Sequence, residues 1–333
     1  MSEFDLFGKD IFGLPREQGG GPLQKRFIWP PFSVLDTKAG AWQTRKRAWL
    51  RLGIQSEMGR GGAKTFAIGT KAQWEAGIKL KKEETPGHAA WGGSGTSVFD
   101  PVLCELIYKW FCPEGGSVLD PFAGGSVRGI VAGCLGYCYT GIELRQEQVK
   151  ANETQRHIVK RKTTPVWIIG DSINAQKIAP GEYDFLFSCP PYYDLEVYSE
   201  EPGELSAKTT YDEFLISYRQ IIKNCANLLK RDRFACFVVG DIRDKKGYYR
   251  GFVADTINAF QECGLNLYND AVLLNPTGSV TIRVGKQFEA SRKLGKMHQN
   301  VLVFVKGNPK EATNAIIGKV DQKTKRRSHN GDV

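Results

Sequence analysis

The sequence predicts an α/β fold: a doubly wound, mostly parallel sheet of seven strands, preceded by a basic, loop-rich N-terminal extension. From about residue 97, short apolar runs alternate with helical patterns, which indicates parallel strands with helices on both faces of the sheet. The 333 residues can bury a large core, and 41% hydrophobic with 25% charged residues is typical of a globular chain. Disordered and membrane-spanning classes fit poorly, because no apolar run approaches the roughly 18 residues that a bilayer crossing needs.

The predicted elements follow in chain order. One short helix is expected at 41–52, within a first part of the chain that is rich in Gly and Pro. A second helix at 99–112 precedes the first strand, and a third at 128–135 follows it. The seven strands are predicted from apolar runs at 117–119, 137–142, 166–169, 185–187, 234–239, 271–274 and 301–305.

Charge divides the chain into three parts. The formal net charge is +10, and residues 25–82 alone hold 13 Lys and Arg against three acids, a net of +10. Residues 306–333 carry a net of +4, so the middle of the chain is close to neutral. We predict a basic N-terminal region at 1–85, one large domain at 86–307 and a basic flexible tail at 308–333. The basic regions favour polyanionic partners, nucleic acid before a membrane surface.

Cysteine and histidine placement argues against a metal site. The eight cysteines lie in apolar segments without a C-x-x-C pair, and the chain has only four histidines, so we expect no metal. The first residues, Met1 to Asp5, are acidic and lack the basic and apolar regions of a secretory signal. We therefore expect reduced thiols, no membrane association and a cytoplasmic location.

A ligand loop follows the first predicted strand. It consists of Asp120, Pro121, Phe122, Ala123, Gly124, Gly125 and Ser126. A Gly-rich turn at this position lets the backbone approach a ligand, and the helix behind it presents free N–H groups. The loop has neither a G-x-G-x-x-G pattern nor the Gly-Lys-Ser/Thr of a phosphate-binding loop. Its acid indicates a ligand with an amine or a sulfonium.

Two more carboxylates end the next two strands. Glu143 ends the run at 137–142, 23 residues after Asp120, a position from which an acid can accept hydrogen bonds from both hydroxyls of a ribose. Asp171 follows the run at 166–169, where it can accept a hydrogen bond from an adenine amino group. One acid at a strand end is commonplace, but three acids at three successive strand ends favour a ligand site over three unrelated surface turns.

The fourth predicted strand is followed by the most informative string, Cys189-Pro190-Pro191-Tyr192. Together with the loop at Asp120, it makes residues 89–307 resemble the S-adenosylmethionine-dependent DNA amino-methyltransferases. This family pairs an Asp-Pro-Phe-x-Gly loop with an Asp/Asn/Ser-Pro-Pro-Tyr/Phe loop, and here the cofactor half precedes the catalytic half. The resemblance implies a Rossmann-like class I methyltransferase fold and S-adenosylmethionine as cofactor. It also implies methylation of the exocyclic amino nitrogen of a flipped cytosine or adenine in duplex DNA, as in restriction-modification systems.

The resemblance implies a role for each site residue. Phe99 and the loop 120–125 surround the methionine moiety, Glu143 binds the ribose and Asp171 binds the adenine ring. The catalytic loop consists of Cys189, Pro190, Pro191 and Tyr192. In the family, the first residue and a backbone carbonyl accept hydrogen bonds from the amino group, and the last ring stacks on the flipped base.

Cys189 departs from the family pattern, which has Asp, Asn or Ser there. Sulfur is a weak acceptor, so activation of the amino group depends on the Pro190 carbonyl, or on Ser188 if the loop is shifted. Cysteine is nearest to serine in size, which mildly favours cytosine as the target. In the alternative hypothesis, Cys189 is a thiolate nucleophile that permits methylation of cytosine carbon 5. An RNA amino-methyltransferase and a catalytically inactive nucleic-acid-binding homologue are further alternatives.

Two basic segments are candidates for DNA contact. Residues 276–299, between the last two strands, form a long loop of net +4 that we expect to contact phosphates near the flipped base. Within 25–82, cations lie beside aromatic residues. This pattern suits binding of a nucleic-acid strand, but it equally suits a small core with a basic face. We favour DNA contact. The candidates are Arg45, Lys46, Arg47, Arg283, Lys286, Arg292, Lys293 and Lys296. The acidic insertion at 194–207 is expected to be a gate over the pocket or a plain surface loop.

Overall fold

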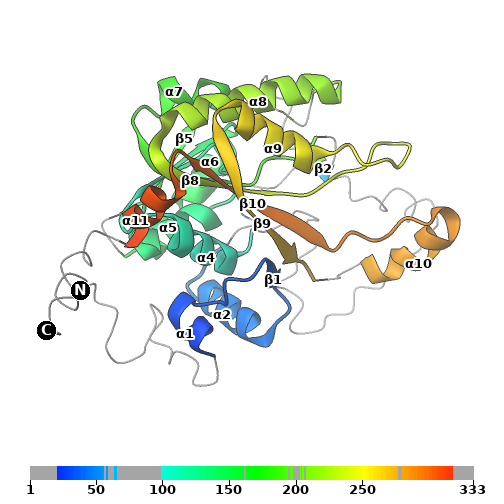
Figure 1. The fold of residues 1–333 in the computed structure, drawn as a ribbon, viewed down its shortest axis with the longest axis horizontal. Coiled ribbons are helices and arrows are strands. Elements are labelled where there is room, and N and C mark those ends of the chain that lie inside the picture. The colour runs from blue at the N-terminus through cyan, green and yellow to red at the C-terminus, as the bar shows by residue number, and fades with distance from the viewer. Residues whose placement is uncertain are drawn as a thin grey trace, which may run out of the picture.

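The computed structural model describes residues 21–55, 58, 64–65, 99–160, 163–193, 196–197, 203, 205, 208–276 and 280–317. A large sheet lies at its centre with helices on both faces, so the predicted α/β fold is confirmed (Figure 1). The predictions for 1–20, for most of 194–207 and for 318–333 lie outside the described residues. Within the described part, no helix is both long and apolar enough to cross a membrane.

Eight strands form the main sheet: β1 (Val34–Asp36), β3 (Ser117–Asp120), β4 (Cys138–Glu143), β5 (Val166–Ile169), β6 (Tyr183–Ser188), β8 (Leu229–Val239), β9 (Leu265–Leu274) and β10 (His298–Lys306). Their order across the sheet is β1-β9-β10-β8-β6-β3-β4-β5. Neighbouring strands run parallel except at β10, which is antiparallel to both β8 and β9. All seven predicted strands are present, but the predicted count is wrong because the N-terminal region adds an eighth.

The eighth strand, β1, pairs in parallel with β9, so that Leu35 lies opposite Leu273. Leu35 is buried, and the hydroxyl of Thr37 donates to the carbonyl of Leu274 at 2.6 Å. This strand is not evident in the sequence because three residues are too few to show a period of two. The N-terminal region therefore contributes directly to the sheet.

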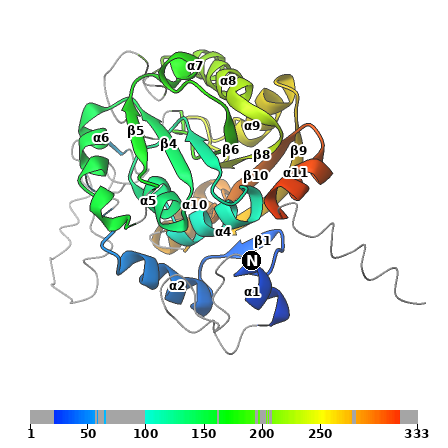
Figure 2. The same cartoon turned by 90° about the vertical axis from the view of Figure 1, so that its left-hand side faces the viewer.

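Helices lie on both faces of the sheet and at its ends. They are α1 (Pro22–Phe27), α2 (Gly40–Leu50), α4 (Pro101–Phe111), α5 (Val127–Leu135), α6 (Gln146–Glu153), α7 (Ala175–Ile178), α8 (Tyr211–Leu228), α9 (Phe252–Glu262), α10 (Val280–Ser291) and α11 (Pro309–Ile317), with short 3₁₀ turns η2 (Arg156–Ile158) and η3 (Ser172–Asn174). Figure 2 shows α7, α8 and α9 on one face and α4, α5 and α11 on the other. The predicted helices at 41–52, 99–112 and 128–135 correspond to α2, α4 and α5.

Alternating side chains of the central strands fill two cores. On β6, Phe185 and Phe187 belong to the core under α4 and α5, whereas Leu186 belongs to the core under α8 and α9. On the second side, Phe260 of α9 stacks on Phe304 of β10 with ring centroids 4.1 Å apart. Both faces are buried, so the strands appear in the sequence as continuous apolar runs. The packing fixes the strand register and with it the position of the strand ends.

The C-terminal segment is partly helical. Residues 309–317 form α11, whose start is capped by Asn308: the side chain of Asn308 accepts a hydrogen bond from the backbone N–H of Lys310 at 2.8 Å. Ala312 is buried and Ile316 packs against the core. The predicted flexible tail is therefore wrong up to Ile317. The Asn-Pro pair at 308–309 is an ordinary helix start signal that the basic composition of the segment obscured.

A small second sheet links two distant segments. β2 (Lys64–Thr65) of the N-terminal region pairs in antiparallel fashion with β7 (Glu196–Val197). β7 begins four residues after Tyr192, the last residue of the Pro-Pro-Tyr string. The N-terminal region therefore runs beside the chain that leaves this loop.

Candidate active site

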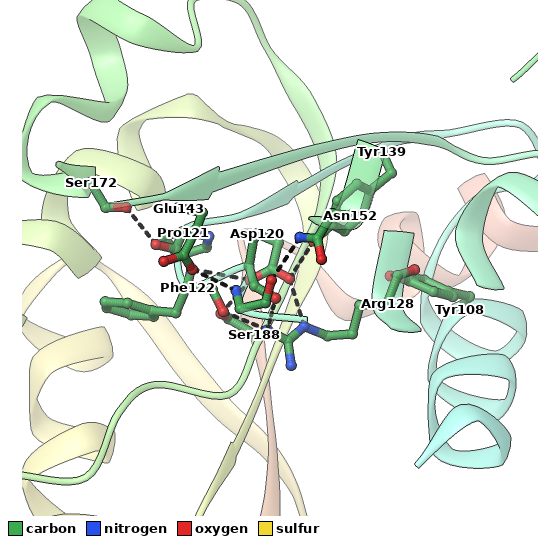
Figure 3. Close-up of polar contacts among 12 residues, drawn as sticks. Tyr108, Asp120, Pro121, Phe122, Arg128, Tyr139, Glu143, Asn152, Ser172 and Ser188 are labelled. Atoms are coloured by element: carbon green, nitrogen blue, oxygen red, sulfur yellow. Dashed lines mark hydrogen bonds and ion pairs between the residues drawn. The ribbon is translucent and has the colours of Figure 1, made fainter. Parts of the chain in front are cut away.

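The carboxyl ends of β3, β4, β5 and β6 meet at one edge of the sheet (Figure 3). Asp120 and Glu143 are the last residues of β3 and β4, and Asp171 lies two residues after β5. Ser188 ends β6, and Cys189 follows directly. Because the strands are parallel, the residues predicted at separate strand ends lie at the same edge.

Asp120 is fully buried, and its carboxylate is held by four protein donors. Oδ2 accepts hydrogen bonds from Arg128 Nε at 2.6 Å and from the Tyr139 hydroxyl at 2.7 Å. Oδ1 accepts from the Ser188 hydroxyl at 2.5 Å and from the backbone N–H of Phe122 at 3.1 Å. The expectation that this carboxylate meets the amine of a ligand is corrected by the geometry. Asp120 is paired with Arg128 and holds the loop in place.

Arg128, on α5, is the centre of this arrangement and was not among the predicted site residues. Its Nη2 donates to the carbonyls of Phe122 and Ala123, and its guanidinium lies 4.7 Å from the centre of the Phe99 ring. Burial opposes the charge, but the adjacent carboxylate of Asp120 outweighs it and raises the pKa of Arg128 above the ordinary value. A single arginine in the otherwise apolar stretch 127–135 was the available signal.

A second set of hydrogen bonds holds Gly124 of the same loop. The backbone N–H of Gly124 donates to Glu143 Oε2 at 2.9 Å, and the Asn152 side chain donates to the Gly124 carbonyl at 2.7 Å. The other oxygen of Glu143 accepts from the backbone N–H of Arg145 at 3.0 Å. Gly124 has φ +51°, in the left-handed region that favours glycine. The loop is thus fixed from β4 and α6 as well as from β3.

The loop also leaves room and a polar atom for a ligand. Among the residues that the structure describes, a Cβ placed on Gly124 would have only the Phe122 carbonyl within 4 Å, at 3.9 Å, so this side of the loop is open to them. Ser126, at the start of α5, is fully buried, and its hydroxyl has no hydrogen-bond partner in the described part of the chain. A buried hydroxyl without a partner costs about 1–3 kcal/mol, so a ligand that bonds to it is favoured.

Asp171 is fixed at the end of β5. Its Oδ1 accepts a hydrogen bond from the backbone N–H of Ile173 at 2.9 Å, and the hydroxyl of neighbouring Ser172 donates to the carbonyl of Pro121. Gly203, from the insertion that follows the Pro-Pro-Tyr loop, passes close to the other oxygen: a Cβ on Gly203 would lie 2.6 Å from Asp171 Oδ2. The insertion therefore reaches the predicted adenine end of the site.

The Cys-Pro-Pro-Tyr loop begins directly beside the first loop. Ser188 is fully buried and its hydroxyl donates to Asp120, which disfavours the alternative in which Ser188 receives the target amino group. Cys189 is half-buried against the core, within electrostatic reach of Arg128. Pro190 and Pro191 follow it and restrict the backbone of the loop.

Tyr192, the predicted stacking residue, is held by its hydroxyl. The Gln299 side chain donates to Tyr192 Oη at 2.6 Å, and Gln299 is in turn contacted by the Asn275 amide at 3.4 Å. The ring meets Phe252 of α9 edge to face with centroids 5.9 Å apart. Gln299 is thus a positioning residue, although in the sequence it marks only the end of a predicted loop.

The basic residues of α2 have partners within the protein. Arg45 donates to both carboxylate oxygens of buried Glu105 at 2.6 and 2.5 Å, and Lys46 Nζ lies 3.0 Å from Asp100 Oδ2. These ion pairs attach α2 to α4, and the DNA contacts of Arg45 and Lys46 stay predictions. Arg47 is exposed and remains a candidate.

The segment 276–299 is less of a loop than expected, because 280–291 form α10. Lys286 and Arg292 are exposed, and Lys293 and Lys296 are half-buried. Arg283 lies in the first half of α10; its side chain is outside the described part. All five predicted cations thus belong to one projecting segment.

The fold and site define a doubly wound α/β protein whose two ligand loops meet at the carboxyl edge of a parallel sheet. Residues 183–332 match the family model described as DNA methylase, which confirms the predicted resemblance over this part of the chain. The comparison with curated proteins found no match.

Solved structures similar to this chain include TrmN from Thermus thermophilus, at 12% identity and a TM-score of 0.44 over 66% of this chain and 52% of that one. A methyltransferase from Pyrococcus furiosus matches at 17% identity and a TM-score of 0.41, over 72% and 94% of the two chains. Magnesium protoporphyrin IX methyltransferase from Synechocystis PCC 6803 with bound SAM matches at 12% and 0.38, over 59% and 71%. The chain thus spans about half the length of TrmN. These likenesses are too distant to assign a substrate.

Proposed function

We propose that the chain transfers a methyl group from S-adenosylmethionine to the exocyclic amino nitrogen of a flipped cytosine or adenine in DNA. The observation that carries the proposal is the 2.5 Å hydrogen bond between the Ser188 hydroxyl and Asp120. It ties the Pro-Pro-Tyr loop to the Asp-Pro-Phe loop across the neighbouring strands β3 and β6. A methyl donor at one loop and an amino group at the other then lie within reach of each other. The DNA methylase match of residues 183–332 supports this assignment.

The residues at the strand ends fit the cofactor. When bound, it supplies an electrophilic methyl group on a sulfonium. The Ser126 hydroxyl, buried and without a partner in the described structure, suits the methionine end, with the open side of Gly124 next to it. Glu143 is half-buried at the end of β4, and its carboxylate oxygens are of the acceptor type that ribose hydroxyls require. Asp171 is assigned to the adenine ring of the cofactor, whose amino group it would accept a hydrogen bond from.

The second loop activates the base. The lone pair of an exocyclic amino nitrogen is delocalised into the ring, so acceptors for its N–H groups must hold it toward the methyl carbon. The Pro190 carbonyl is the strongest acceptor that the loop offers, because the sulfur of Cys189 is a weak one. The Tyr192 ring, fixed by Gln299, stacks on the flipped base. The cysteine at this position mildly favours cytosine over adenine.

Methyl-labelled cofactor offered separately with duplex DNA, single-stranded DNA and bulk RNA tests the proposal. We expect the labelled methyl group to be found in DNA. Label in RNA alone would identify an RNA methyltransferase, and DNA binding without any label would identify an inactive homologue.

Methylation of cytosine carbon 5 is the second candidate, since Cys189 directly follows β6 at the sheet edge where the two loops meet and a thiol there can act as a nucleophile. The Cys189→Ser variant separates the two. Amino methylation keeps near-normal activity in this variant, whereas a covalent mechanism loses its nucleophile and all activity.

A further inference from the structure

A second surface of the described chain combines cations with exposed aromatics. The turn between β8 and α9 and the helix α10 project from the same end of the sheet (Figure 1). Within the turn, Arg243 forms an isolated bridge with Tyr249, and its guanidinium donates to the Gly247 carbonyl at 2.7 Å. Asp244 closes the turn: its carboxylate accepts from the backbone N–H of Tyr248 at 2.9 Å. The turn is therefore an ordered hairpin.

The segment after α10 is packed against this hairpin. The Arg243 guanidinium lies 3.8 Å from the centre of the Tyr249 ring, and Lys296 Nζ lies 5.5 Å from the same centre. Lys293 lies so close to Gly247 that a Cβ there would collide with Lys293 Nζ. We call residues 243–249 together with 292–296 the Tyr248 surface.

The cations of this surface outnumber the acids of the turn. The two acids of the turn hold the backbone: Asp244 closes the hairpin, and Asp241 accepts from the backbone N–H groups of Gly251 and Phe252 at 3.0 and 2.8 Å. The cations of the surface are Arg243, Lys245, Lys246, Arg292, Lys293 and Lys296. Grouped like charges repel one another, and phosphates relieve the repulsion.

Aromatic exposure distinguishes a nucleic-acid strand from other polyanions. Tyr248, at the tip of the hairpin, is 71% exposed, and Tyr249 is 47% exposed. Exposed rings between phosphate-binding cations suit the stacking of unpaired bases.

The hairpin starts at the catalytic loop. Gly240, directly after β8, lies against Tyr192: a Cβ on Gly240 would be 3.4 Å from Tyr192 Oη. We propose that the Tyr248 surface binds the DNA strand beside the target base, with Lys245, Lys246 and the 292–296 cations on its phosphates and Tyr248 stacked on an unpaired base. This inference rests on the proposed function and adds to it the path of the substrate strand.

Equilibrium binding of a fluorescein-labelled single strand of about 20 nucleotides tests the inference, since one site of this kind spans about 4–16 nucleotides. The Tyr248→Ala variant should bind about tenfold more weakly, whereas Tyr248→Phe keeps the ring and should bind like the native chain. The Lys245→Gln, Lys246→Gln double variant should lower the slope of log K against log salt by about 1.4, because each phosphate that is no longer neutralised lowers the slope by about 0.7.

Lys223→Gln with Lys310→Gln, on α8 and α11, is the matched control, since both lysines are exposed and lie outside the Tyr248 surface. The inference is overturned if Tyr248→Ala binds like the native chain, or if the control loses as much of the salt slope as the Lys245, Lys246 variant. Methyl incorporation is measured separately. A native chain that binds the strand at the Tyr248 surface but labels no base would refute the proposed function alone.

Discussion

The helix α2 and the Tyr248 surface have similar composition, cations beside aromatic rings, but use it in opposite ways. In α2, Trp42 and Trp49 are fully buried and Arg45 is paired with buried Glu105. At the Tyr248 surface Tyr248 and Tyr249 are exposed, and so are the cations Lys245, Lys246 and Arg292. Composition alone therefore does not separate a small core from an exposed basic surface. Whether acids from distant segments lie beside the cations determines which of the two forms.

The largest expected effect concerns α2. Replacing Arg45 with Met removes the cationic partner of Glu105, whose side chain is 2% exposed, and leaves it the hydrogen bond from the Trp49 indole at 2.8 Å. The free energy of unfolding should fall by about 3 kcal/mol in urea denaturation. The DNA salt dependence should not change. Arg47→Met is the control and should change stability by less than about 0.5 kcal/mol. A stable Arg45→Met variant with weakened DNA binding would show that α2 and the Tyr248 surface act alike.

Point variants are preferable to deleting residues 1–85, which would also remove two buried tryptophans and β1.

The strand-end site resembles α2 because it also contains a buried ion pair, that of Asp120 with Arg128. Ser188→Ala leaves one oxygen of buried Asp120 without its 2.5 Å hydrogen bond and should cost about 2 kcal/mol of unfolding free energy. Ser126→Ala is the matched control: it removes a buried hydroxyl without a partner in the described structure, so stability should hold while the Kd for S-adenosylmethionine rises. Denaturation and calorimetric titration measure the two quantities. Equal stability losses in both variants would contradict the assignment of Ser126 to the ligand.

The smallest expected effect is a pH dependence of the Tyr248 surface. Burial lowers the pKa of Lys296 below that of an exposed lysine: it outweighs the attraction of Asp241, which raises the pKa, and repulsion from Arg243 adds to the lowering. As pH rises, Lys296 therefore loses its proton before an exposed lysine does, and affinity for DNA should begin to fall below the ordinary lysine range of about 10.4. Lys296→Arg keeps its charge and should remove this early step in a pH series of binding measurements. Identical profiles for the two chains would exclude Lys296 from the surface.

Local patterns predicted most of the fold. Each of the seven apolar runs became a strand because both faces of the sheet are buried. β1 and α11 were missed: one is three residues long, and the start signal of the other, at Asn308, lay in a basic segment. The strand-end acids were found from their positions, but the partners of Asp120 were not. Those contacts join residues up to 68 positions apart, and no local pattern encodes them.

The same limit applies to the predicted DNA contacts. The acids that pair with Arg45 and Lys46 lie more than 50 residues further along the chain, so α2 resembled a basic surface. The Tyr248 hairpin was overlooked because its net charge is small when Asp241 and Asp244 are counted, although both acids are committed to the backbone. What each charge contacts matters more than how many charges a segment holds.

The central claim is that the two interlocked loops bring a methyl donor to the amino nitrogen of a base in DNA. The most direct test is mass analysis of the nucleosides released from DNA that has been incubated with the native chain and methyl-labelled S-adenosylmethionine. The account predicts label in N4-methylcytosine or N6-methyladenine. Label in 5-methylcytosine, or no labelled nucleoside from DNA that the chain binds, would contradict it.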